Sequence, residues 1–246
     1  LRYLEHYEFK LVRKALAERE ILLKNAPHII KPLTFCLPHQ AHLRPAWLIH
    51  IGLFLYNNLA KRVTLPASKG VVFSPDSPLV STITKGFEYS DAWVDDARLV
   101  ILNALAAQDY GASIKTQTQC IKAVREDNIW TITLKDNLHG KMSLIRSRSI
   151  VNAAGPWVAK LFSSTLPNKS PQNIRLVKGS HIVVPRIHEQ PQAYILQNVD
   201  QRIVFVSPFE DSFSLIGTTD VEYNGDPSAV EISNEEIDYL LNITNT

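Results

Sequence analysis

The stretch IRLVKGSHIVVPR, residues 174–186, brings two cationic side chains and an imidazole into one short run. Arg175 and Lys178 suit a phosphorylated substrate, and an Arg binds phosphate best through a bidentate contact. His181 has an ordinary pKa near 6.5, which suits a general base at neutral pH. The same residues could equally be the solvent-facing side of an edge strand. Other parts of the sequence are needed to tell a substrate-binding site from a purely structural strand.

The spacing of Lys178 and His181 bears on this choice. Residues three apart in a regular strand point to opposite faces of the sheet. Gly179 lies between them and would permit a bulge that brings both side chains to one side.

A second stretch with chemical potential is SIVNAAGPWVAKLF, residues 149–162. A short apolar strand there ends in the small residues Ala153, Ala154 and Gly155, and Pro156 suits the first position of a helix. Small residues let a flat or phosphorylated cofactor approach the backbone, whose helix start offers free N–H groups. A plain strand-to-helix turn explains the pattern as well. No Gly-x-Gly-x-x-Gly motif occurs in the chain.

Other reactive residue types carry weaker signals. The loop histidines His39, His42 and His50 lack the helical spacing and second carboxylate of a zinc site, so we expect no metal. No nucleophile elbow, phosphate-binding loop or Cys-x-x-Cys motif is present.

Composition narrows the class of protein. The 246 residues allow one large domain or two small ones, and 45% apolar with 20% charged residues indicates a globular chain. A net charge of +2 is too small to favour nucleic acid as a partner. Cys36 and Cys120 lie among apolar residues far apart in the sequence, which predicts buried free thiols and a reducing compartment.

Apolar residues at intervals of three and four predict four helices. They are expected at residues 1–25, 46–62, 94–112 and from 233 onward. Asp95 would cap the third helix and Gly111 would end it, while Ser233 and Glu236 form a capping box for the fourth. The Pro- and His-rich residues 26–45 read as an extended loop.

The helix at 46–62 is apolar around much of its circumference and ends in Lys61 and Arg62. Burial against protein explains this pattern. Contact with a membrane surface explains it too, since interfacial segments combine aromatic and apolar residues with a basic flank. No run of about 18 apolar residues could span a bilayer.

Strand patterns divide into two groups. SIKTQTQCIKAV, IWTITLKD and MSLIRSRSIVNAAG follow the third helix and predict half of a mononucleotide-binding α/β unit. Residues 174–225 hold four short strands with no helix between them, which predicts an antiparallel sheet and a second domain.

Several of these motifs together resemble one family. NAAGPWV, preceded by GFEYSDAWVDDARL at 86–99 and followed by IRLVKGSHIVVPR and SLIGTTDVEYNGDP at 214–227, resembles the FAD-dependent, respiratory glycerol-3-phosphate dehydrogenases. These belong to the D-amino-acid-oxidase-like flavoenzymes. The opening LRYLE is similar to that family's continuation of a Gly-Gly-x-Arg-Tyr segment, and the resemblance runs along essentially the whole chain.

The resemblance implies site residues. For FAD it implies a backbone contact on the adenine side from Cys120, Ile121 and Lys122, and a wall near the flavin from Asn152, Ala153, Ala154, Gly155 and Trp157. For substrate it implies Arg2, Tyr3, the KGSH segment with Lys178 and His181, and the GTTD strand with Thr219. His181 and Arg2 would be catalytic, as base and as phosphate or flavin contact.

The resemblance also implies a domain plan of α/β plus α+β class, with part of an FAD-binding Rossmann-like domain and an antiparallel-sheet substrate domain. Residues 1–62 are expected to form a helical part of the FAD domain, and residues 63–93 a loop with short strands leading to the domain junction. Residues 94–162 are expected to form a further FAD-binding portion, 174–225 the substrate-domain sheet, and 226–246 the start of a following helix.

The family's Gly-rich FAD motif and a later segment with a further Arg and Lys do not occur here. We therefore expect an internal piece of a longer protein that, alone, neither holds FAD tightly nor turns over.

The activity that the resemblance implies is oxidation of sn-glycerol 3-phosphate to dihydroxyacetone phosphate, with electrons passed from FAD to membrane quinone. A peripheral location at the cytoplasmic side of the cell membrane follows, with the piece itself soluble and a homodimer left open. Two alternatives remain: a non-catalytic α/β binding module of the same family, and a glycerol-3-phosphate oxidase that uses oxygen.

Overall fold

The computed structural model describes residues 8–166, 174–200 and 202–245. The chain forms two compact units, and each is made from segments that are distant in the sequence. The first unit contains residues 1–102, 179–220 and 231–246, and the second contains 103–178 and 221–230.

The first unit is built on one seven-stranded sheet in the order β2-β3-β1-β9-β10-β11-β8. All neighbouring strands are antiparallel except β1 and β9, which are parallel. The strands are β1 (Ile30–Pro38), β2 (Lys69–Val72), β3 (Lys85–Val94), β8 (His181–Pro185), β9 (Ala193–Gln197), β10 (Ile203–Phe209) and β11 (Phe213–Gly217). The predicted antiparallel sheet within 174–225 is therefore confirmed for β8 to β11, and it is larger than predicted.

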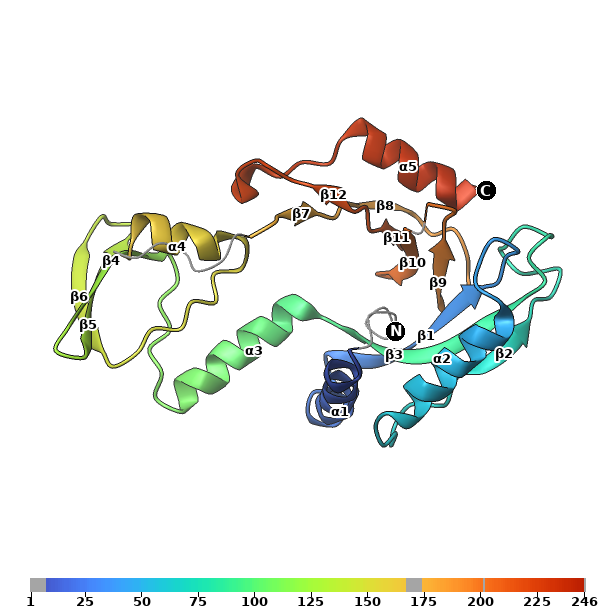
Figure 1. The fold of residues 1–246 in the computed structure, drawn as a ribbon, viewed down its shortest axis with the longest axis horizontal. Helices are drawn as coiled ribbons and strands as arrows, with labels where there is room; N and C mark the ends of the chain where they lie inside the picture. The colour runs from blue at the N-terminus through green and yellow to red at the C-terminus, as the bar shows by residue number, and fades with distance from the viewer. Residues whose placement is uncertain (1–7, 167–173, 201, 246) are drawn as a thin grey trace. The chain divides into compact units, whose positions relative to one another are not determined.

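Helices cover both faces of this sheet (Figure 1). On one face α1 (Phe9–Asn25) and α2 (Ala46–Asn58) bury Leu16, Leu53 and Tyr56 against β1, β3 and β9. On the other face α5 (Asn234–Asn245) buries Leu240 against the middle of the sheet. The apolar core thus lies in two layers, because the strands alternate side chains between the faces.

The prediction of a loop over 26–45 is wrong, since Ile30–Pro38 is the nine-residue strand β1. Pro32 and Pro38 argue against a central strand, because proline cannot donate to a ladder. The strand forms nonetheless, with all nine residues in register opposite β3. Burial of Cys36 and Leu37 on the two faces stabilises it. Tertiary pairing here overrides a local preference.

The predicted helices are confirmed within the described residues. Helix α3 (Asp96–Asp109) starts after Asp95, whose Oδ1 accepts a hydrogen bond from the Arg98 N–H at 3.0 Å. Gly111, with φ of +89°, follows its end. The capping box of α5 also forms: the Ser233 N–H donates to Glu236 Oε2 at 2.9 Å, and the Glu236 N–H reaches Ser233 Oγ at 3.4 Å.

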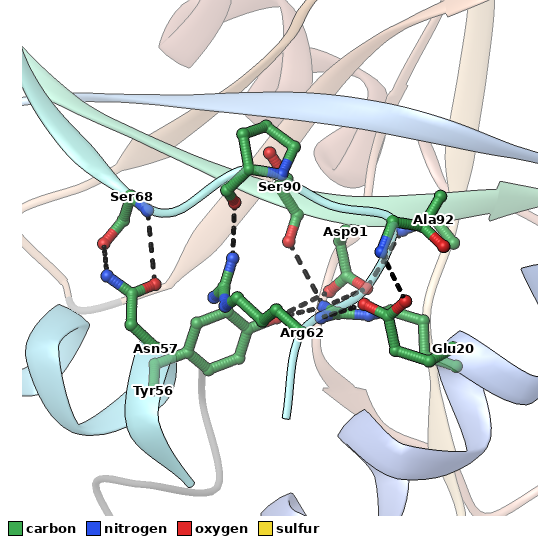
Figure 2. Close-up of polar contacts among 11 residues, drawn as sticks. Glu20, Tyr56, Asn57, Arg62, Ser68, Ser90, Asp91 and Ala92 are labelled. Carbon is green, nitrogen blue, oxygen red and sulfur yellow. Dashed lines mark hydrogen bonds and ion pairs between the residues drawn. The ribbon is translucent and has the colours of Figure 1, made fainter. Parts of the chain in front are cut away.

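A polar cluster fastens α1 and the end of α2 to β3 (Figure 2). Nη1 of the buried Arg19 donates to Tyr56 Oη at 2.7 Å and to the Ser90 carbonyl at 3.2 Å, and pairs with Asp91 at 3.2 Å. The Arg62 guanidinium lies over the Tyr56 ring, 5.3 Å from its centroid. Burial raises the pKa of Tyr56 to about 12, so its phenol stays protonated and can accept from Arg19 at neutral pH.

The second unit holds two small sheets and short helices. Its elements are β4 (Thr118–Glu126), β5 (Ile129–Asp136) and β6 (Met142–Ser147), then η2 (Gly155–Trp157), α4 (Val158–Ser164), β7 (Val177–Lys178), β12 (Val221–Glu222) and η3 (Pro227–Ala229). Strands β4, β5 and β6 form an antiparallel meander, and β7 pairs with β12. The strand predicted to continue through Val151 ends at Ser147 instead, because no described segment pairs with 148–154.

In the first unit, residues 8–62 pack with the strands of 181–217. The assignment of segments to an FAD domain and a substrate domain stays a prediction. Both cysteines are free. Cys36 is buried as predicted, and burial raises its thiol pKa to about 12. Cys120 is only half-buried.

Candidate functional site

His181 is the first residue of β8 and lies opposite Gly217 of β11. The next residue, Ile182, packs into the core beneath α5, so the imidazole points to the opposite face of the sheet. Gly217 lies opposite Phe205, which packs on the side of α1 and α2. His181 therefore lies on that face of the sheet, and it is exposed, as is Val183 two residues further on.

Gly217 makes room for the imidazole. A Cβ atom at Gly217 would lie 2.6 Å from His181 Cγ and would overlap Cδ2, so only glycine lets the ring lie against the strand. One face of the ring is thereby shielded although the residue as a whole is exposed. Loss of hydration lowers the pKa of His181 from the ordinary value of 6.5, so the ring is neutral at neutral pH and can accept a proton.

Thr219 is buried in the segment that follows β11. Its hydroxyl accepts a hydrogen bond from the Ser180 N–H at 2.8 Å and donates to Glu236 Oε1 at 2.7 Å. Both bonds are internal to the first unit. The predicted substrate contact of this hydroxyl would have to use its remaining lone pair, because its hydrogen is donated to Glu236.

Lys178 and Arg175 belong to the second unit. Lys178 ends β7, opposite Val221 of β12, and is half-buried. Arg175 pairs with Glu222 at 3.4 Å, with both side chains exposed, so this pair contributes little to stability. Arg175 thus fits the solvent-facing alternative. Arg2 and Tyr3 lie outside the described residues.

The predicted adenine-side contacts lie on β4, one of the two edge strands of the meander. Cys120 pairs with Leu134 and Lys122 with Thr133, so Ile121 is the extra residue of a β-bulge. A bulge leaves a residue outside the ladder. This geometry fits a backbone contact to a cofactor.

The predicted flavin wall forms a turn in the same unit. Asn152 shapes it: its Nδ2 donates to the Val158 carbonyl at 2.9 Å, and its Oδ1 accepts from the Ala154 N–H at 3.3 Å. Gly155 has φ of +53°, which explains a glycine there. Ala153, Ala154, Gly155 and Trp157 are all exposed. Small exposed residues beside an indole fit a flat aromatic cofactor such as FAD, which these residues would hold.

Among the described residues, His181 and Thr219 lie in the first unit, whereas Lys178 and the predicted cofactor contacts lie in the second. Two residues that sequence reasoning missed matter to the site: Gly217 beneath the imidazole and Glu236 behind Ser180. Gly217 is part of the SLIGTTD motif, and a glycine inside a strand is a signal of close approach. Among the described residues, no group of three or more His, Cys, Asp or Glu side chains could hold a metal ion.

The first unit is a mixed sheet with helices on both faces, and the second unit carries the predicted cofactor contacts. The chain belongs to the FAD-dependent oxidoreductase family, whose pattern it matches over residues 1–246.

Curated relatives are similar over the whole chain. It is 58% identical to a glycerol-3-phosphate dehydrogenase of Pseudomonas aeruginosa over 245 residues, which cover 100% of this chain and 48% of that protein. It is also 58% identical to the aerobic glycerol-3-phosphate dehydrogenase of Escherichia coli over 246 residues, which cover 100% of this chain and 49% of that protein. It is also 48% identical over 248 residues to a D-erythritol 1-phosphate dehydrogenase of Brucella abortus, with 100% of this chain and 49% of that protein covered. The chain therefore spans about half the length of the curated relatives it matches.

Solved structures agree with the fold. A glycerol-3-phosphate dehydrogenase of Bacillus halodurans complexed with FAD matches 93% of this chain and 42% of that chain, with a TM-score of 0.72 and 26% identity. Glycine oxidase of Geobacillus kaustophilus shares the fold, with a TM-score of 0.61 at 18% identity over 96% of this chain and 60% of that chain. These matches confirm the predicted fold class and family resemblance.

Proposed function

We propose that the protein oxidises the secondary alcohol of sn-glycerol 3-phosphate to dihydroxyacetone phosphate. The observation that carries this proposal is the His181 imidazole, uncharged and exposed on the sheet face, in the KGSH segment of the family resemblance. The names of the relatives at 58% identity support the substrate.

The chemistry requires a hydride acceptor and a base. FAD, when bound, supplies the acceptor of the hydride. His181 removes the hydroxyl proton onto its free ring nitrogen, and the lowered pKa keeps that nitrogen unprotonated at neutral pH. The acidic limb of kcat/KM should therefore lie below pH 6.5, since protonation of the free enzyme's base abolishes activity.

The substrate phosphate needs fixed cations. Arg2 and Lys178 are proposed to supply them, with Tyr3 beside Arg2. The cofactor contacts proposed from the resemblance are the bulge at Cys120, Ile121 and Lys122 and the turn at Asn152–Trp157. The substrate would then be held by cations while the imidazole acts on its hydroxyl.

A direct test uses the full-length protein. Glycerol 3-phosphate should bleach the flavin absorption band, and His181→Ala should lower kcat by roughly 10²- to 10⁴-fold with the flavin still bound. Replacing Arg2 should act mainly on KM, if it contributes equally to ground-state and transition-state binding. No bleaching with glycerol 3-phosphate or with erythritol phosphate would favour the non-catalytic binding module.

Comparison of the two phosphates also tests specificity, because the chain is 48% identical to an enzyme named for D-erythritol 1-phosphate. A higher kcat/KM with erythritol phosphate would overturn the proposed substrate and keep the proposed reaction. We propose that quinone, rather than oxygen, accepts the electrons of the reduced flavin.

We further propose that α2 rests on a membrane surface. Its Leu53 and Tyr56 are buried in the core, while the opposite side is an exposed apolar stripe. The stripe consists of Trp47, Leu48, Ile51, Phe54 and Leu55, which are 38% to 65% exposed. An open hollow of about 560 Å³ at the C-terminal end of the helix is lined by Arg13, Lys61 and Arg62 among others. Apolar rings beside cations suit an anionic bilayer.

No helix among the described residues is long and apolar enough to cross a membrane. We propose a peripheral contact on the cytoplasmic side, as the resemblance implies. The full-length protein carrying Trp47→Ser and Phe54→Ser should lose binding to phosphatidylglycerol vesicles, and Lys61→Gln should weaken it. Leu138→Ser, which removes an equally exposed apolar side chain from a turn of the second unit, is the matched control. Unchanged vesicle binding in the double variant would contradict membrane contact.

A further inference from the structure

Ser180, the residue before His181, is held through all of its polar groups. Its N–H donates to Thr219 Oγ1 at 2.8 Å, its carbonyl accepts from the Thr219 N–H at 3.2 Å, and its hydroxyl donates to Glu236 Oε1 at 2.9 Å. A residue bound at three points fixes the backbone from which the next side chain projects.

The carboxylate of Glu236 is the centre of this arrangement. Glu236 is 4% exposed on the first turn of α5. Its Oε1 accepts from the hydroxyls of both Ser180 and Thr219, and its Oε2 accepts from the Ser233 N–H. One carboxylate thus ties together the KGSH segment, the GTTD segment and the start of α5. Burying a carboxylate is costly unless such bonds compensate it.

Two glycines complete the fit around His181. A Cβ atom at Gly179 would overlap Thr218 Oγ1, and a Cβ atom at Gly217 would overlap the imidazole. The two segments therefore approach more closely than side chains would normally permit. The position of the ring against Gly217 depends on the two segments staying in this register.

We propose that Glu236 is a positioning residue, whose carboxylate, acting through Ser180 and Thr219, holds the His181 imidazole against Gly217 in the orientation that proton removal requires. Glu236 would act on the imidazole through Ser180 and Thr219, the residues whose hydroxyls it binds. The inference rests on the proposed role of His181 as base. Glu236 would then have two roles, in the capping box that starts α5 and in the positioning of His181.

A pair of conservative substitutions tests the inference in the full-length, FAD-loaded protein. Glu236→Gln keeps the shape of the side chain but replaces one carboxylate oxygen by an amide nitrogen. That nitrogen cannot accept the hydrogen bond that the Ser233 N–H now donates. Thr219→Val keeps the volume, leaves Glu236 in place and removes the hydroxyl between Ser180 and Glu236. Both should lower kcat by roughly 10- to 100-fold, the effect of misplacing a reacting group, with a smaller change in KM.

The pH profile separates positioning from stability. If the imidazole leaves its place on Gly217, it gains hydration, and the acidic limb of kcat/KM should move up toward pH 6.5 in both variants. Ser233→Ala is the matched control, because it weakens the helix cap without removing a bond to Ser180 or Thr219. It should lower the melting temperature and leave kcat and the pH profile unchanged.

Each outcome bears on the proposal. Should Glu236→Gln fail to fold, Thr219→Val decides alone, since its volume is conserved. Variants that match Ser233→Ala in kcat and pH profile would overturn the positioning role. A wild-type protein whose flavin is not reduced by either polyol phosphate would instead overturn the proposed function, which is a different result.

Discussion

The position of the His181 imidazole depends on Gly217, which has no side chain. Gly217 lies directly opposite it in the ladder, and the space of a Cβ atom there is taken by the ring. This contact fixes the ring against the strand, and burial lowers the pKa of His181.

We predict that Gly217→Ala displaces the imidazole and lowers kcat by roughly 10- to 100-fold, because the added methyl group occupies the position of the ring. Steady-state kinetics with a soluble dye as electron acceptor measure this effect. Gly52→Ala is the control, since a Cβ atom at Gly52 meets nothing within 4 Å. Equal kcat in the two variants would show that the ring does not need its place on Gly217.

Helix α2 has one side buried in the core and another side exposed. Leu53 is 4% exposed and belongs to the core that α1 and α2 form on the sheet, whereas its neighbour Phe54 is 65% exposed. Because successive residues point about 100° apart around a helix, adjacent apolar residues can face opposite surroundings.

Substitutions at these two neighbours should differ in effect. Leu53→Ala should destabilise the protein by about 2–5 kcal/mol, the cost of an emptied core position, while Phe54→Ala should change stability by less than about 0.5 kcal/mol. Denaturant unfolding of the full-length protein measures both. A large loss with Phe54→Ala would mean that the exposed stripe packs against protein rather than lipid.

Among the histidines that the structure describes, only His188 is buried, and its burial affects stability. His188 is 8% exposed and lines a hollow of about 330 Å³ beside the ring of Tyr194. Neither of its ring nitrogens forms a hydrogen bond of ordinary geometry with another described residue. Burial lowers its pKa, and this outweighs the opposing effect of the Gln190 backbone.

The unfolded chain therefore binds a proton at this histidine at a higher pH than the folded one does. The free energy of unfolding should fall as the pH drops below about 6.5, by at most about 1.4 kcal/mol per pH unit from this group. His188→Phe should flatten that dependence between pH 7 and 5. Thermal unfolding across this pH range measures the difference, and parallel curves for wild type and His188→Phe would contradict it.

Local signals in the sequence determined much of this protein. The capping box of Ser233 and Glu236, the cap at Asp95 and the amphipathic helices could be predicted, because each depends on residues within a few positions of one another. The motifs that carry the family resemblance are likewise continuous stretches, and the match over residues 1–246 confirms them.

Only the tertiary structure decided which segments share a unit. Strand β1 looked like a loop because of its prolines, and it is a strand because β3 and β9, which are distant in the sequence, pair with it. The same holds for the site. Nothing within the KGSH segment reveals that Gly217 lies beneath His181 or that Glu236 binds Ser180, because hydrogen bonds and steric fit between distant segments exist only once the sheet has formed.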